Sequence, residues 1–362
     1  MTSGLKKKIT FAVIAVFAAA AVFIFMTRSR STSERKDRVS WQDLDKMLSA
    51  GDFDGPIALL DAHLKNQPND GLLRYFKARV LYEKGDTFKA LAETEKALIL
   101  GFPQGSAWLL KGVIYGGKLG DYKKQAEYAS KALFDDPSDE EAYLIRAEAR
   151  AVLKDHTGAA RDLTSYLAFN PKDAFAYINR AGAFYELADY PAALADAGKA
   201  LSLDPKKDYA HFIAGRSLAA RKDFKGAIAR FTSAIELSPE RSAYYVQRAE
   251  AYEKLNDFYD AAWDYSTAMA APEVHCCASY YYLLGANMYR INEVQAALKA
   301  AGEALRRGGE TPAFLELRGR ILAQAGRPKE AARDFKRMAE LEPGRGPDAE
   351  KYLRRLGKDG KK

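Results

Sequence analysis

The sequence has few of the residues that build metal centres or disulfide frameworks. Its 362 residues include two cysteines, which are adjacent at Cys276 and Cys277, and four histidines. Neighbouring cysteines rarely pair with each other, so a disulfide framework is excluded. His275 forms the only cluster of soft ligands with these cysteines, and consecutive residues seldom point at one metal ion. We therefore expect no metal site.

Motifs of phosphate binding and hydrolysis are also missing. The sequence contains no glycine-rich phosphate loop and no His-Glu-x-x-His pair. No serine or cysteine has a position that argues for a nucleophile. We therefore expect a protein that is not an enzyme and that needs no cofactor, with an enzyme of unrecognised site as the alternative.

One long apolar run stands near the start of the chain. A basic tail over residues 1–8 precedes it, and a charged linker over residues 28–36 follows it. About 18 apolar residues can cross a bilayer as a helix, so residues 9–27 are predicted to form a transmembrane signal anchor. A cleaved signal peptide is an alternative, since residues 18–21 are all alanine, and such small side chains suit a cleavage site. A buried soluble helix is a third.

The remainder of the chain repeats one pattern with a period near 34 residues, as residues 174–207 illustrate. Each repeat holds two apolar stripes at helical spacing, a turn between them, and in most repeats a proline at the end. Small residues recur at fixed places and let two helices approach closely. Helices of about a dozen residues are marginal alone, so the hairpins must stabilise one another by stacking.

Trp108, Gly112 and Tyr115 occupy the aromatic, small and aromatic positions of one first helix, and here the pattern resembles the tetratricopeptide repeat. The resemblance implies an all-α fold, a right-handed superhelical solenoid of about nine helix-turn-helix repeats plus a capping helix. With the N-terminal transmembrane helix, this predicts an array over residues 37–345 and a capping helix and basic tail over residues 346–362. Nine repeats fit the frame: 37–70, 71–104, 105–139, 140–173, 174–207, 208–241, 242–275, 278–311 and 312–345.

Two positions of the repeats vary together. The seventh position is basic in the same repeats in which the twenty-third is acidic, and a repeat that lacks the base also lacks the acid, as in Leu284 and Ala300. This covariation predicts a structural salt bridge between the two helices of a hairpin, with two merely exposed polar positions as the alternative. Lys111 has no acid in its own repeat and is expected to lack a partner. The predicted pairs are Lys77 with Glu93, Arg146 with Asp162, Arg180 with Asp196, Arg248 with Asp264, and Arg318 with Asp334.

The resemblance also implies a concave groove, lined by the first helices, in which protein or peptide partners bind. Aromatic side chains with scattered arginine and asparagine suit a protein-binding surface. The alternative is that many of these aromatics pack between neighbouring hairpins. The candidate groove residues are Tyr75, Phe76, Arg79, Tyr82, Asn179, Tyr185, Tyr209, Phe212, Arg216, Gln247, Tyr282, Asn287, Tyr289 and Arg290.

These features favour a membrane-anchored scaffold or adaptor that mediates protein–protein interaction in the assembly or regulation of a membrane or envelope complex. The alternatives are a receptor for client polypeptides, resembling organelle import receptors, and an exported soluble repeat protein after signal cleavage. No three consecutive repeats supply the lysine and asparagine set with which chaperone adaptors clamp a C-terminal carboxylate. A chaperone-tail receptor is therefore not expected.

Charge gives weak information about location and further partners. Lysines and arginines flank residues 9–27 on both sides in nearly equal number, so the positive-inside rule does not fix the orientation. A short tail before a first anchor usually stays in the cytoplasm, which favours a single-pass protein of the bacterial inner membrane with its repeats outside the cytoplasm. The basic C-terminal end is interpreted as a solvated helix face rather than a nucleic-acid site. The sequence leaves the oligomeric state open.

Overall fold

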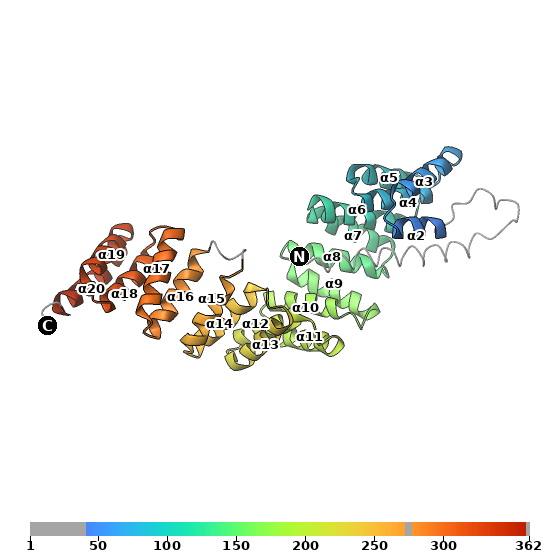
Figure 1. Ribbon diagram of the computed structural model, residues 1–362. Coiled ribbons are helices and arrows are strands. Elements are labelled where there is room, and N and C mark those ends of the chain that lie inside the picture. The colour runs from blue at the N-terminus through green and yellow to red at the C-terminus, as the bar shows by residue number, and fades with distance from the viewer. Residues whose placement is uncertain (1–40, 272–276, 360–362) are drawn as a thin grey trace. The chain divides into compact units, whose positions relative to one another are not determined.

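Helices make up almost all of the chain that the structure describes. The computed structural model describes residues 41–271 and 277–359, and these ranges contain α-helices and one 3-10 turn but no strand (Figure 1). The predicted membrane segment, residues 9–27, lies outside the described residues. Among the helices within them, none combines the length and the apolar character needed to span a bilayer.

Consecutive helices pair into nine hairpins, and a further helix follows the ninth. The hairpins are α2 (Trp41–Ser49) with α3 (Asp54–Asn66), α4 (Gly71–Lys84) with α5 (Thr87–Ile99), α6 (Gln104–Leu119) with α7 (Tyr122–Asp135), α8 (Glu140–Val152) with α9 (His156–Phe169), α10 (Ala174–Glu186) with α11 (Tyr190–Leu203), α12 (Asp208–Ala220) with α13 (Phe224–Leu237), α14 (Ser242–Lys254) with α15 (Phe258–Ala268), α16 (Ala278–Arg290) with α17 (Val294–Gly308), and α18 (Pro312–Gln324) with α19 (Pro328–Leu341). The last helix, α20 (Gly346–Asp359), follows the 3-10 turn Pro343–Arg345.

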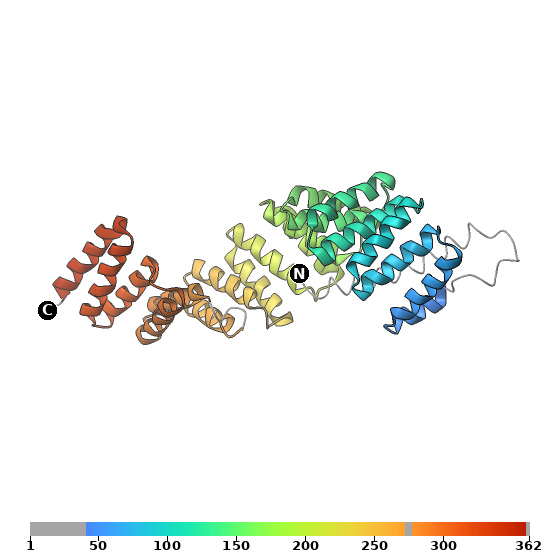
Figure 2. The same cartoon turned by 90° about the horizontal axis from the view of Figure 1, so that it is seen from above.

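The hairpins belong to two compact units, which we call the N-terminal block (residues 1–169) and the C-terminal block (residues 170–362). Within each block every hairpin packs on the next one along the chain, and the view from above shows the hairpins stacked side by side (Figure 2). The nine-repeat frame read from the sequence therefore matches the hairpins in order and number within the described residues.

In most repeats the turn between the two helices contains a residue in the left-handed backbone conformation, followed by an aspartate that caps the second helix. Gly120 has a φ of +70° and is followed by Asp121, whose carboxylate accepts a hydrogen bond from a backbone N–H in the first turn of α7. The same turn in the next block places Ala188 at a φ of +60° before the capping Asp189. Glycine adopts this region without steric cost, whereas alanine does not. The aspartate satisfies an N–H group that would otherwise lack an acceptor.

Small residues set the distance between the two helices of a hairpin. In α12, Gly215 lies so close to the Phe231 ring of α13 that an added Cβ would approach it to 2.6 Å. Gly319 and Phe335 repeat this arrangement in the last hairpin, where a Cβ would lie 2.8 Å from the ring. The glycine in the first helix therefore makes room for an aromatic ring in the second.

The core consists of a series of apolar clusters, each shared by neighbouring hairpins. In the N-terminal block, Phe76 packs with Leu60 and Leu64 of the preceding hairpin. At the other end, Tyr352 of α20 stacks on Phe335, with ring centroids 4.5 Å apart. The predicted capping helix is thus present, and it covers the apolar face of the last hairpin.

Candidate functional site

Charged pairs lie inside the hairpins at the predicted positions in five repeats, and in four of these an arginine holds an aspartate. Arg146 donates hydrogen bonds from Nε and Nη2 to the two carboxylate oxygens of Asp162, at 2.9 and 2.7 Å. Arginine forks hold carboxylates in this same two-point geometry between Arg180 and Asp196, Arg248 and Asp264, and Arg318 and Asp334. All four carboxylates are buried. These charges therefore hold helices together and are not available to a substrate.

One predicted assignment is extended by the structure and another is corrected. Lys77 forms the predicted ion pair with Glu93 at 3.8 Å, and it also donates a shorter hydrogen bond to Asp61 at 2.6 Å. Lys111, which was expected to lack a partner, donates to Glu95 at 2.6 Å. Asp61 and Glu95 each lie sixteen residues upstream of their lysine, on the second helix of the preceding hairpin. A base at the seventh position lies between two second helices, so its carboxylate can come from either side.

The arginines also use this second side. Besides its own carboxylate, Arg146 donates to the Ser130 hydroxyl at 3.3 Å, and Arg248 donates to the Thr232 hydroxyl at 2.9 Å. Each hydroxyl belongs to the preceding hairpin. The base thus ties neighbouring hairpins to each other as well as the two helices of one hairpin.

The candidate groove residues fall into three classes of exposure. Asn179, Tyr209 and Arg290 are exposed. Several are half-buried, namely Tyr75, Tyr82, Tyr185, Arg216, Gln247, Tyr282 and Tyr289. Four are buried: Phe76, Arg79, Phe212 and Asn287.

The buried members correct the prediction for those positions. Phe76 is 2% exposed, and Phe212 packs on the Tyr244 ring with centroids 4.7 Å apart. Asn287 is 0% exposed, and its amide donates to the Glu253 carboxylate and to a backbone carbonyl of its own helix. These side chains are buried against neighbouring hairpins, Phe76 and Asn287 against the preceding one and Phe212 against the next one, so they do not face a partner.

We call the surface formed by α4, α6 and α8 the first-helix face of the N-terminal block. Tyr82 of α4 lies over α6, where a Cβ on Gly117 would come within 3.0 Å of its hydroxyl. Burial, with the charges of Glu83 and of Glu148 from α8, raises the pKa of Tyr82 to about 12. Glycines at residues 116 and 117 leave this part of α6 without side chains, so Tyr82 and Glu148 approach each other across it.

Two carboxylates of α8 face the same surface in unlike surroundings. Burial raises the pKa of Glu141, and the positive charge of Arg79 opposes that rise. Burial also raises the pKa of Glu148, but here only a hydrogen bond from the Gln125 amide opposes it. The unfavourable burial of the Glu148 charge is thus offset by a neutral donor alone.

Gln125 extends toward this face from a second helix. It lies on α7, is 2% exposed, and donates its amide to the Ile145 carbonyl and to the Glu148 carboxylate, both at 3.3 Å. Its side chain occupies the space beside Gly116, because a Cβ there would overlap the Gln125 amide. Glycine at 116 is therefore required for the Gln125 to Glu148 contact.

The corresponding face of the C-terminal block is formed by α10, α12, α14, α16 and α18. Arg216 of α12 places its guanidinium 4.0 Å from the centre of the Tyr185 ring and 3.8 Å from the Glu186 carboxylate. On α14, Gln247 donates to Glu250 at 2.8 Å. Aromatic and charged side chains thus also meet on this face.

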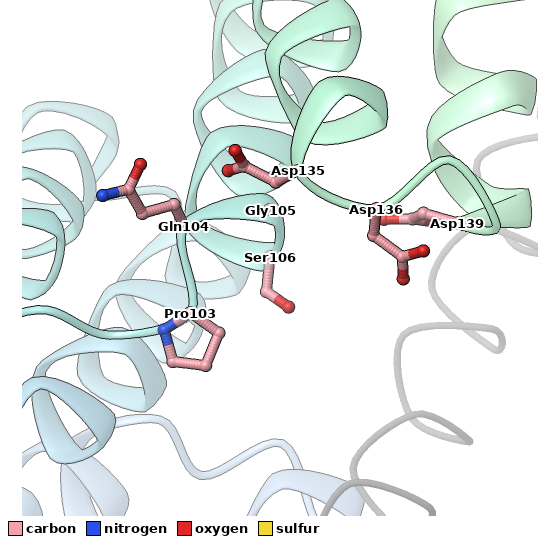
Figure 3. Close-up of a pocket in the computed structure, with 7 residues that line it drawn as sticks. All are labelled: Pro103, Gln104, Gly105, Ser106, Asp135, Asp136 and Asp139. Carbon is pink, nitrogen blue, oxygen red and sulfur yellow. The ribbon is translucent and has the colours of Figure 1, made fainter.

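A hollow of about 410 Å³ lies at the starts of α6 and α8 (Figure 3). Asp136 accepts hydrogen bonds from the Ser138 hydroxyl and N–H, and Asp139 caps α8 by accepting from Ala142. Asp136 and Asp139 thus accept hydrogen bonds within the turn that they form. No lysine, arginine, histidine or cysteine lines the hollow. The lining residues are Pro103, Gln104, Gly105, Ser106, Asp135, Asp136 and Asp139.

Metal-ligating side chains do not gather in the described part of the chain, where no group of three could hold an ion. Of the soft-ligand cluster noted in the sequence, Cys277 precedes α16, and the residues 275–276 lie outside the described ranges. Glu141, Glu148 and Gln125 were not among the predicted site residues. The signal that could have found Glu148 is the ninth position of the repeats, where it follows Val113.

Comparison with known proteins places the hairpins in a family. The family model described as the tetratricopeptide repeat matches residues 117–174, 178–242 and 282–350, which together are more than half of the chain. No curated protein sequence matches the chain.

Solved structures with similar hairpins differ widely in sequence. A tetratricopeptide repeat protein from Parabacteroides merdae is 16% identical, with a match that covers 70% of this chain and 98% of that chain at a TM-score of 0.49. PilW, described as a type IV pilus biogenesis factor, is 21% identical over 56% of this chain and 92% of its own, at a TM-score of 0.49. YrrB, described as having an unusual peptide-binding site, is 20% identical over 51% and 94%, at a TM-score of 0.48. The hairpins and the match over more than half of the sequence agree, and the chain belongs to the tetratricopeptide repeat family.

Proposed function

We propose that the chain is an interaction scaffold that binds segments of partner proteins on the first-helix faces of its two blocks. The observation that carries this proposal is that two sets of polar side chains have different surroundings. The paired arginines and aspartates bind each other inside the hairpins, whereas Tyr82, Glu148, Tyr185 and Arg216 are half-buried on the first-helix faces.

The chemistry of these faces suits protein partners. Half-buried tyrosines and arginines supply large contact areas with a polar tip, and such residues dominate the binding energy of many interfaces. Arg216 on Tyr185 forms a cation–π pair that is already assembled before a partner arrives. A partner segment would therefore meet side chains that lose little freedom on binding.

We further propose that residues 9–27 anchor the scaffold in a membrane, where it takes part in assembling or regulating a membrane or envelope complex. The basis is the apolar run with basic residues on both sides. The flanking charges nearly balance, and the short tail before the anchor favours repeats outside the cytoplasm of a bacterial inner membrane. Edman sequencing of the mature N-terminus would separate an intact anchor from a cleaved signal peptide.

Photo-crosslinking in intact membranes tests the binding proposal. A photoreactive amino acid would replace Tyr185 on the face of the C-terminal block, and in a separate variant Lys225, which is exposed on a second helix. We expect specific partner segments to be captured at position 185 and few or none at position 225. Equal capture at both positions, or none at either block's first-helix face, would refute the proposal.

A further inference from the structure

Glu148 differs from the carboxylate at the equivalent place in the other block. Both Glu148 and Glu250 occupy the ninth position of their repeats. Glu250 follows a repeat that carries Arg216 at that position, and the arginine charge acts on it. Glu148 follows a repeat that carries Val113 there. One acid thus has a cation from the neighbouring hairpin, and the other has a valine.

The bonding of Glu148 is incomplete for a half-buried carboxylate. Among the described residues its hydrogen-bond partner is the neutral Gln125 amide at 3.3 Å, and no lysine or arginine of these residues forms an ion pair with it. An ionised carboxylate can accept about four hydrogen bonds. A charge removed from water without a counter-ion is unfavourable. Glu148 can therefore accept further hydrogen bonds, and binding a cation from outside the fold would lower its free energy.

The surroundings of Glu148 are apolar on its own helix. Leu144 and Val152 stand four residues before and after it, so all three side chains share one face of α8. Val152 is 44% exposed and Leu144 is half-buried. The long aliphatic stem of a lysine or arginine can pack on such neighbours while its charged head reaches the carboxylate.

The opposite side of the site is aromatic. Gly116 and Gly117 add no side chains of their own there, Gln125 lies beside Gly116, and the Tyr82 hydroxyl lies beside Gly117. The Lys118 amine lies 5.1 Å from the Tyr82 ring, so the outer side of this ring already accepts a cation. The site thus combines a carboxylate, an aromatic ring and apolar neighbours.

We propose that the first-helix face of the N-terminal block binds a basic partner segment, and that Glu148 receives a lysine or arginine side chain of that segment. This inference rests on the proposed function and names the chemistry of one partner. Charge complementarity supports it, because the site offers an acid that lacks a counter-ion within the described fold. Glu141, two turns before Glu148, faces Arg79 and is not the receiving group.

Crosslinking of the full-length chain in its membrane tests this inference. A photoreactive amino acid would replace Val152, and captured segments would be sequenced by mass spectrometry. We expect segments with a lysine or arginine close to the crosslinked residue. The substitution Glu148→Gln keeps the size and the amide contact but removes the charge, and it should lower the yield about tenfold. The matched control is Glu127→Gln, which removes an exposed charge of α7 in the same block.

The outcomes separate this inference from the proposed function. Captured segments without basic residues, or a yield that Glu148→Gln leaves unchanged, would overturn the inference. So would capture of this chain's own basic residues 28–38, since the occupant would then be intramolecular. Capture at position 185 but not at 152 would overturn the inference while the scaffold proposal stands. Failure at both positions would overturn both. A circular dichroism spectrum equal to wild type establishes that Glu148→Gln is folded.

Discussion

Removing the carboxylate from the ion pair of one hairpin should make that hairpin easier to open. Asp264 is 1% exposed and accepts two hydrogen bonds from Arg248, both at 2.8 Å. Asp264→Ala leaves the arginine mostly buried, with the Thr232 hydroxyl as its side-chain hydrogen-bond acceptor among the described residues. Breaking a buried ion pair at one end costs about 3–5 kcal/mol, because the other charge stays buried. We expect the free energy of local opening of α14 and α15 to fall by about this amount.

The chain itself supplies the control, since the eighth repeat has Leu284 and Ala300 at the same two positions. The double variant Arg248→Leu with Asp264→Ala copies that repeat. Replacing a buried ion pair by apolar residues is often close to neutral, so the double variant should recover most of the loss.

Native-state hydrogen exchange read by mass spectrometry measures the opening of this hairpin separately from the rest of the array. The reasoning is refuted if α14 and α15 of Asp264→Ala exchange as slowly as wild type. It is also refuted if the double variant exchanges as fast as the single one.

Three further predictions concern packing, backbone and charge. Gly215→Ala should lower the free energy of unfolding by about 1–3 kcal/mol, because its Cβ would lie 2.6 Å from the Phe231 ring; Gly198→Ala, with nothing within 4 Å, should raise it by about 0.5–1 kcal/mol. Ala188→Gly should raise it by about 0.5–1 kcal/mol, because alanine is strained at a φ of +60°. Urea titration checks both, and the opposite sign in either would contradict the structural reason. Glu148 has a raised pKa in the folded state, so its ionised form destabilises the fold at neutral pH, and this penalty disappears as the pH falls through that pKa. Glu148→Gln should therefore be more stable than wild type near neutral pH, with the difference shrinking toward a pH of about 4.5; equal differences at both pH values would rule this out.

The fold and the ion pairs within a hairpin could be predicted because the same residue pattern recurs in most repeats. The pair Arg180 and Asp196 recurs with the same spacing in other repeats, so covariation within the chain indicates the contact. The partner of Lys111 and the second partner of Lys77 were missed because these acids lie in the preceding repeat. The period of the pattern gives the position of a residue in its own hairpin, and it does not say which neighbouring hairpin a long side chain reaches.

The first-helix face was harder to predict for a related reason. Phe76 and Phe212 have the same residue type as a binding aromatic, and only packing against a neighbouring hairpin decides that they are buried. Glu148 was missed because its importance depends on what surrounds it. An acid at this position is ordinary until its neighbours are known to be Val113 and glycines rather than an arginine.

The contact of one base with two hairpins has a consequence for how the array responds to force. A partner that pulls along the stack loads each junction in turn, and junctions tied by Arg146 or Arg248 resist through hydrogen bonds on both sides. The sixth and eighth hairpins carry Ala214 and Leu284 at that position. Within the C-terminal block these two hairpins should yield first under tension, so the extension of the scaffold under load is set by two repeats rather than shared equally by all.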